Sequence, residues 1–257
     1  HGSMLLYALS YLVGYKDCTL NQIKQFRQLG SKTAGHPEFG LLKSIETTTG
    51  PLGQGFANSV GMALAEKILN LKFGNVFDHK TWCIVGDGCL MEGISQESIS
   101  FAGHHGLNKL IVLFDNNKIS IDGSVNLTCS DDQEKRFNAS NWNTITINGH
   151  DFDEIDNALK KVKKSKKPTL ISCKTLIGFG SPNKAGTESC HGSPLGIDEA
   201  ALTKKNLNWP HKSFFIPEKI IKEWKKIGER GHSINKRWMS KFQKSSKNKE
   251  ILRQMKS

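Results

Sequence analysis

A β-α-β pattern occupies residues 81–119, which read TWCIVGDGCLMEGISQESISFAGHHGLNKLIVLFDNNKI. Apolar runs at 82–85 and 110–114 flank a segment of helical character from Glu92 to His105. Both runs are continuously apolar rather than alternating, which is typical of parallel strands covered by helices on both faces. The pattern therefore predicts an α/β fold with a doubly wound, mostly parallel sheet.

The same alternation extends on both sides of this unit. A glycine-rich segment at 50–55 leads into a helix with apolar side chains at helical spacing up to Lys72. Strands are predicted at 144–147 and 169–174, around a helix at 153–164.

A loop-rich region follows Ile177, and a Lys-rich helical segment comes after it. Long ordered loops usually carry functional residues, so we expect the glycine-bearing stretches at 178–183 and 190–194 to serve a site. We assign residues 1–216 to one α/β domain and 217–257 to terminal helices that lead into a linker.

The 257 residues carry a formal net charge of +12. Six lysines between 160 and 167 lie near the end of a predicted helix, where cations complement the helix dipole and face water. This explanation is favoured over nucleic-acid binding. Without a long apolar run or a signal-peptide pattern, the sequence predicts a cytoplasmic protein that makes no membrane contact. The six cysteines are scattered, which argues against a zinc site or a disulfide framework.

A Gly-Asp-Gly turn follows the first strand, and two asparagines follow the second. Gly86 and Gly88 allow a sharp turn, so that Asp87 projects a carboxylate into the crevice where open α/β sheets bind ligands. Asn117 brings a second oxygen to the same edge, and the next helix N-terminus suits an anion. Mg²⁺ takes one or two protein oxygens and completes its shell with phosphate and water. The turn alone is more often structural, but the pair predicts a Mg²⁺–diphosphate site.

Seven blocks of the sequence, in order along the chain, resemble the transketolase family. Among them, the turn Gly86-Asp87-Gly88 followed by Asn116-Asn117 resembles the signature of thiamine-diphosphate enzymes. The blocks lie at 1–7, 26–30, 35–39, 47–55, 86–90, 115–119 and 178–184. The resemblance implies the N-terminal, diphosphate-binding domain of a transketolase, in a chain that is truncated at both ends.

The resemblance also implies ligands for Mg²⁺ and for thiamine diphosphate. The metal ligands would be Asp87, the side chain of Asn117 and the carbonyl of Ile119, and Ca²⁺ could take the place of Mg²⁺. The residues that contact the cofactor would be His1, Gly50, Pro51, Leu52, Gly88, Asn117, Ile121, Ile177 and His191. Core packing is an equally good explanation for Ile121 and Ile177.

Three histidines lie in glycine-flanked loops that match family motifs, namely His1, His36 and His191. The resemblance implies that His36 and His191 are catalytic, assisting proton transfers and binding sugar hydroxyls. His1 has another explanation, because His-Gly-Ser-Met also occurs as a cloning scar. His104 and His105 match no such role and are predicted to be structural.

Two acids, Glu92 and Glu97, lie near the start of the helix that follows the turn. Acidic side chains there complement the helix dipole. The resemblance implies another role, in which these acids pair across the interface of a homodimer and share a proton.

The implied function is transfer of a two-carbon ketol unit from a ketose phosphate, such as xylulose 5-phosphate, to an aldose phosphate, such as ribose 5-phosphate, in the pentose phosphate pathway. The family's activating glutamate and sugar-phosphate arginines would lie in a following domain, so we expect the chain alone to be inactive. Two alternatives remain: a related enzyme, such as dihydroxyacetone synthase or deoxyxylulose-phosphate synthase, and a non-catalytic subunit. The blocks at 35–38 and 47–50 favour transketolase over the related enzymes.

Overall fold

The computed structural model describes residues 2–256, which form two compact units. Unit 1 comprises the chain up to Thr49, Glu66–Asp78 and the chain from His211 onward. Unit 2 comprises Gly50–Ala65 and His79–Pro210. Within residues 2–256, no helix has the length and apolar character needed to cross a membrane.

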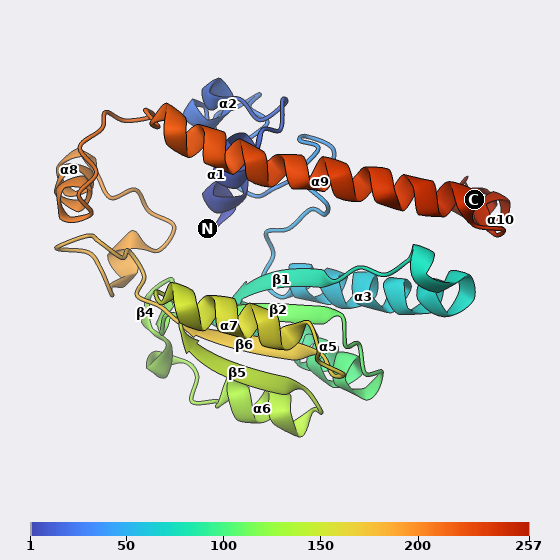
Figure 1. Ribbon diagram of the computed structural model, residues 1–257. Helices are drawn as coiled ribbons and strands as arrows, with labels where there is room; N and C mark the ends of the chain where they lie inside the picture. Colours follow the sequence, from blue (N-terminus) through green and yellow to red (C-terminus); the bar gives the residue numbers. More distant parts are fainter. Residues whose placement is uncertain (1, 257) are drawn as a thin grey trace. The chain divides into compact units, whose positions relative to one another are not determined.

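Unit 2 is built on a four-stranded sheet in the order β1-β2-β6-β5, and all its neighbouring strands run parallel (Figure 1). The strands are β1 (Thr81–Gly86), β2 (Leu110–Asn116), β5 (Asn143–Asn148) and β6 (Thr169–Lys174). Parallel pairing requires crossover connections, and helices supply them. The expected α/β fold with a mostly parallel sheet is therefore confirmed.

Helices cover both faces of this sheet (Figure 1). On one face pack α3 (Gln54–Phe73), α5 (Gly93–His104) and α6 (Gln133–Ala139), and on the other packs α7 (Phe152–Val162). The larger core contains Phe56, Phe114 and Trp142, and the indole of Trp142 donates to the carbonyl of Ile99 at 2.9 Å. This bond satisfies the one polar group of an otherwise apolar side chain.

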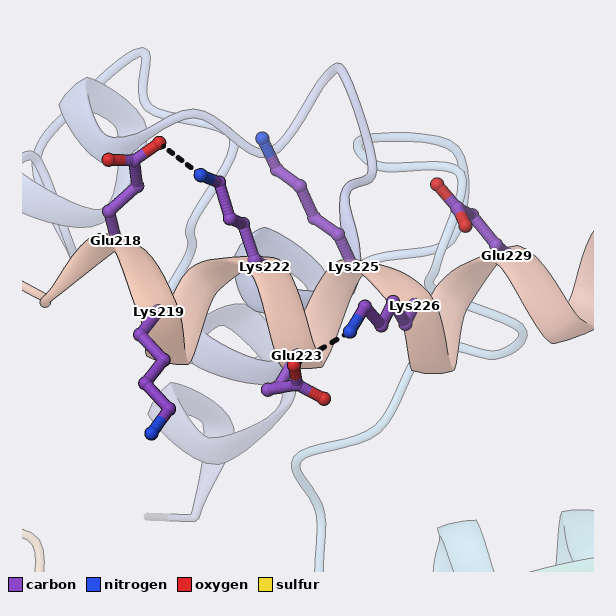
Figure 2. A pocket seen from close by; sticks show the side chains of 7 residues that line it. All are labelled: Glu218, Lys219, Lys222, Glu223, Lys225, Lys226 and Glu229. Carbon is purple, nitrogen blue, oxygen red and sulfur yellow. Dashed lines mark hydrogen bonds and ion pairs between the residues drawn. The ribbon is translucent and has the colours of Figure 1, made fainter.

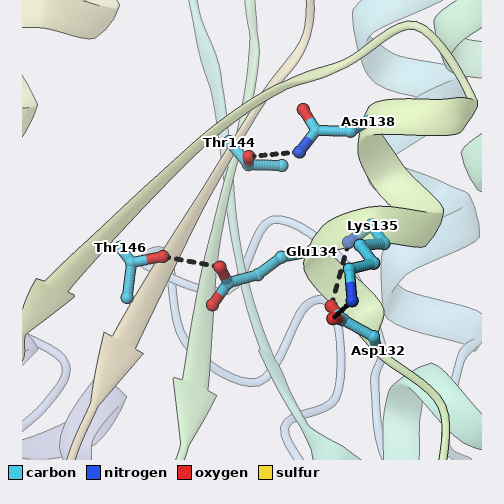
Figure 3. Close-up of polar contacts among 6 residues, drawn as sticks. All are labelled: Asp132, Glu134, Lys135, Asn138, Thr144 and Thr146. Carbon is cyan, nitrogen blue, oxygen red and sulfur yellow. Dashed lines mark hydrogen bonds and ion pairs between the residues drawn. The ribbon is translucent and has the colours of Figure 1, made fainter.

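Two threonines of β5 join the strand to α6 (Figure 3). The Thr146 hydroxyl donates to the Glu134 carboxylate at 2.7 Å, and the Asn138 amide donates to Thr144 Oγ1 at 2.8 Å. Asp132 caps the helix by accepting from the Lys135 backbone amide at 3.0 Å. These bonds hold α6 against β5, which pairs only with β6 among the strands of residues 2–256.

Shorter elements carry the loops of unit 2. They are α4 (Asp87–Met91), β3 (Ile119–Ser120), β4 (Gly123–Ser124), the 3₁₀ turns η2 (Val125–Leu127) and η3 (Glu188–Cys190), and α8 (Ile197–Asn206). The helix expected from Glu92 to His105 is in fact preceded by α4, and the two helices are separated at Glu92, whose ψ of 140° is extended. Helix α8 was not predicted.

Unit 1 consists of helices and long loops. Its elements are α1 (Ser3–Val13), α2 (Leu20–Lys24), the 3₁₀ turn η1 (Gly74–Val76), α9 (Glu218–Lys244) and α10 (Asn248–Lys256), together with the end of α3. Helix α9 packs closely on α1, because a Cβ on Gly228 would lie 2.0 Å from the Val13 carbonyl oxygen. Figure 2 shows the first turns of α9, where Glu218 pairs with Lys222 and Glu223 with Lys226, both at 2.8 Å.

Candidate metal and diphosphate site

The strand register places the ends of β1, β2 and β6 side by side. Gly86 lies opposite Asp115, and Asp115 lies opposite Cys173. The turns that follow these strands therefore share the carboxyl edge of the sheet, where open α/β sheets bind their ligands. Asp87 and Asn117, the two residues whose side chains are predicted to bind a metal, both follow strands at this edge.

Asp87 is the first residue of α4 and is 8% exposed. Its Oδ2 is buried, with no hydrogen-bond partner among residues 2–256. Burial raises the pKa of this carboxyl to about 6, and Asp115 adds to the rise, while the ammonium and the backbone amide of Lys118 oppose it. A buried carboxylate oxygen without a donor is costly unless a cation faces it. The residue thus fits a hard metal ion.

Asn117 is held on both sides of its amide group. Its Nδ2 donates to Asp115 Oδ2 at 3.0 Å, and its Oδ1 accepts from the Ile119 backbone amide at 2.9 Å. Lys118, which lies between Asn117 and Ile119 in the sequence, has a φ of 63°, in the left-handed region. This turn brings the Lys118 backbone amide to the Asp87 carboxylate. The Gly86-Asp87-Gly88 turn and the turn that contains Asn117 therefore meet.

The other two donors predicted for the metal, the Asn117 side chain and the Ile119 carbonyl, are neutral oxygens. No cluster of three or more His, Cys, Asp or Glu side chains suited to a metal occurs in the described part of the chain. One carboxylate, one amide oxygen and one carbonyl suit Mg²⁺ or Ca²⁺ with phosphate oxygens in the shell, rather than zinc. The donor set present is therefore compatible with the predicted group.

The segment Gly50-Pro51-Leu52 lies against the Gly86-Asp87-Gly88 turn. A Cβ on Gly88 would come 3.2 Å from Leu52 Cδ1, so glycine permits this approach. At the end of the segment, Gly53 has a φ of 78°, and a Cβ there would lie 2.7 Å from Ile94 Cγ2. Pro51 and Leu52 themselves remain exposed. The structure thus brings together two of the segments predicted to contact the cofactor.

The three isoleucines differ in exposure. Ile119 is half-buried in β3, and Ile177 is half-buried in the loop after β6. Ile121 is 71% exposed in the turn between β3 and β4. Core packing, the alternative considered for Ile121, therefore does not account for this side chain.

The histidines fall in different places. His191 follows η3 in unit 2 and is half-buried, and burial lowers the pKa of its imidazole, which favours the neutral form. His36 is exposed in a loop of unit 1, a different unit from Asp87. His1 lies outside the described residues. At the end of α5, the His105 ring lies 4.3 Å from the Phe101 ring and 5.0 Å from that of His104.

Glu92 and Glu97 are both exposed. Glu92 is the N-cap residue of α5, yet its side chain makes no cap hydrogen bond, and Glu97 lies in the second turn. Their exposure leaves both carboxylates available to a partner chain.

Sequence reasoning missed two groups of residues in unit 2. The buried Glu199 carboxylate of α8 accepts hydrogen bonds from Ser181 and Asn183, and these bonds lower its pKa to about 2. The Asp115 carboxylate accepts from Asn117 and from Thr175. The sequence signal for the Glu199 group is an acid in the first turn of an Ala-rich segment. No local pattern indicates the hydrogen bonds of Asp115.

This fold belongs to the class of doubly wound α/β domains that bind ligands at the carboxyl ends of their strands. The family model described as the thiamine diphosphate binding domain of transketolase matches residues 1–256. The chain belongs to this family.

Similar proteins agree with this assignment. A transketolase from Rhodobacter capsulatus is 54% identical over 243 residues, which are 94% of this chain and 36% of that protein. A crystal structure of transketolase from Campylobacter jejuni gives a TM-score of 0.92 at 43% identity, over 97% of this chain and 39% of that chain. A transketolase variant from Pichia stipitis, solved in complex with xylulose 5-phosphate, gives 0.89 at 38% identity, over 95% of this chain and 37% of that chain. The chain thus spans little more than a third of the length of these proteins.

Proposed function

We propose that this chain supplies the diphosphate-binding part of a transketolase, which moves a two-carbon ketol unit from xylulose 5-phosphate to ribose 5-phosphate. The observation that carries the proposal is the buried Oδ2 of Asp87, which has no hydrogen-bond partner among residues 2–256 and lies beside the Asn117 turn. The Pichia stipitis protein, which was solved with xylulose 5-phosphate, supports the donor sugar.

Asp87, the Asn117 side chain and the Ile119 carbonyl would hold Mg²⁺, or Ca²⁺ in its place, and the metal would bind the diphosphate. Thiamine diphosphate, when bound, would stabilise the carbanion that the carbon–carbon bond cleavage requires. Leu52 and Ile121 are exposed apolar side chains that would exclude water from the cofactor. Gly88 would let the diphosphate approach the backbone closely.

His191 would move protons in this reaction. Burial keeps its imidazole neutral, so one ring nitrogen can accept a proton from a sugar hydroxyl near neutral pH. We assign His36 a parallel role. Gly50, Pro51 and Ile177 would line the cofactor, and His1 would contact it.

The proposal extends to the assembly. We propose a cytoplasmic homodimer of the pentose phosphate pathway, with Glu92 and Glu97 at the interface and no nucleic-acid partner. We keep residues 1–216 as the diphosphate-binding domain and 217–257 as terminal helices with a linker. Residues 1–257 alone would bind the cofactor weakly and be inactive, because the resemblance places the activating glutamate of the family in a following domain.

Titration of thiamine diphosphate in the presence of Mg²⁺ tests the assignment in the full natural polypeptide. We expect Asp87→Ala to weaken binding by about a hundredfold or more, because a metal ligand is lost. Asp122→Ala is the matched control, since Asp122 is an exposed acid in the nearby hairpin turn. Equal affinities for Asp87→Ala and the parent protein would contradict the site. A parent that binds the cofactor yet fails to convert xylulose 5-phosphate and ribose 5-phosphate would contradict the reaction.

A further inference from the structure

The Asp115 carboxylate has both of its oxygens engaged. Oδ2 accepts from Asn117 Nδ2 at 3.0 Å, and Oδ1 accepts from the Thr175 hydroxyl. Asp115 lies in β2, Asn117 in the turn that follows, and Thr175 directly after β6. One carboxylate therefore ties two neighbouring strand ends together.

These contacts fix which way the Asn117 amide points. With its nitrogen toward Asp115, its oxygen faces the Ile119 backbone amide, which donates to it at 2.9 Å. Rotation of the amide by half a turn would set its oxygen against a carboxylate and its NH₂ against an N–H group. Both hydrogen bonds would become repulsions, so only the observed orientation is compatible with its neighbours.

The orientation matters because the two ends of an amide differ as ligands. An amide oxygen has two lone pairs, and the Ile119 amide uses one of them, which leaves the other for a hard cation. The NH₂ end offers only donors and repels a cation. A metal at this edge therefore requires the amide to stay as it is.

We propose that Asp115 is a positioning residue that holds the Asn117 oxygen ready for the metal without being a ligand itself. This inference rests on the proposed function of the site. The Thr175 hydroxyl supports the Asp115 carboxylate from the neighbouring strand end. This hydrogen bond connects the turn that contains Asn117 to the segment that leads to Ile177. Asp115 acts through Asn117, so its contribution depends on the presence of that side chain.

That dependence gives the test, a double-mutant cycle on the full natural polypeptide. The measured quantity is the Mg²⁺ concentration needed for half-saturation with thiamine diphosphate, followed by calorimetry. We expect Asp115→Leu to raise it by about tenfold or more, and Asn117→Ala to do the same. In the Asn117→Ala background, adding Asp115→Leu should have almost no further effect. An equal effect of Asp115→Leu in both backgrounds would overturn the proposal.

Two further variants keep the test decisive if Asp115→Leu fails to fold. Asp115→Asn retains an acceptor for Asn117 Nδ2 and can donate to the Thr175 hydroxyl, so we expect it to bind Mg²⁺ within about threefold of the parent. Thr175→Val removes the lateral support alone, and its smaller loss should also vanish when Asn117 is alanine. A Thr175→Val effect that persists without Asn117 would contradict the inference. Failure of the proposed function is distinct, because Asp87→Ala would then leave cofactor binding unchanged.

Discussion

Asn183 donates two hydrogen bonds to the Glu199 carboxylate, one from its backbone amide at 2.9 Å and one from its side-chain amide at 2.8 Å. The Ser181 hydroxyl donates a third. Together they fasten the loop after Ile177 to α8. Three donors on one carboxylate stabilise its ionised form, which accounts for its low pKa.

This arrangement makes stability depend on pH. The pKa of Glu199 falls from 4.5 to about 2 on folding, so its stabilisation is complete above about pH 4.5 and is lost as the pH falls toward 2. We expect Glu199→Gln to lower the unfolding midpoint by a few degrees at pH 7, because an NH₂ group replaces an acceptor. Thermal unfolding from pH 7 to pH 3 should show the gap between variant and parent narrowing with acidity. A gap of constant size would contradict this role.

The left-handed conformation of Lys118 leads to a second prediction. A side chain at a φ of 63° costs about 1–2 kcal/mol that glycine does not incur. Lys118→Gly should therefore be about 1 kcal/mol more stable than Lys118→Ala, the control that also lacks the ammonium but keeps a Cβ. Urea unfolding of both variants measures the difference. Equal stabilities would show that the backbone relaxes on mutation.

Gly53 offers a test of the close packing around residues 50–53. A Cβ there would lie 2.7 Å from Ile94 Cγ2 and 2.9 Å from Glu92 Cβ, at a φ of 78°. We expect Gly53→Ala to destabilise the protein by about 1–3 kcal/mol. Gly61→Ala in α3 is the matched control, because a Cβ there meets nothing within 4 Å, and it should be neutral or stabilising. Similar losses in both variants would contradict the packing argument.

Kinetics test the histidines. We expect His191→Ala and His36→Ala to slow ketol transfer by about a hundredfold or more while cofactor affinity stays within about tenfold. His104→Ala, at the end of α5, is the control and should leave turnover unchanged. Normal turnover in either of the first two variants would remove that histidine from the catalytic set.

The assembly can be tested with the exposed acids of α5. If Glu92 and Glu97 share a proton with their counterparts in a partner, then Glu97→Ala should weaken the dimer by leaving a carboxyl group without its hydrogen-bond partner. Analytical ultracentrifugation over a range of concentrations would follow the change. Glu188→Ala serves as control, because it removes the same kind of side chain at an exposed site outside α5. Equal dimer stability for both would contradict the interface.

Much of the fold could be predicted from the sequence because its signals are local. The strand at 169–174 and the helix starting near 54 follow from continuous apolar runs and helical spacing. The break at Glu92 has no local signal, and the residues around it, Glu92, Ile94 and Ser95, lie against Gly53 from a distant part of the chain. Helix α8 was hidden among glycine and proline turn signals.

The contrast between local signals and long-range contacts applies to the site as well. Asp87 and Asn117 could be placed at one edge of the sheet because strand ends of a parallel sheet meet there. The bond from Thr175 to Asp115 spans 60 positions, and nothing in either local pattern predicts it. The direction of the Asn117 amide depends on that contact network, so it could only be read from the structure.

The attachment of α6 to β5 also affects solubility. On the face of the sheet that α6 covers, Phe137 of the helix is fully buried beside Phe56 and Trp142. The helix lies beside β5, held by Glu134 on Thr146 and by Asn138 on Thr144. Loosening it would expose Phe137 and the apolar core around it before the rest of the sheet came apart. Mutations at these exposed contacts would then first cause newly made protein to aggregate. The molecules that fold would keep an unchanged site.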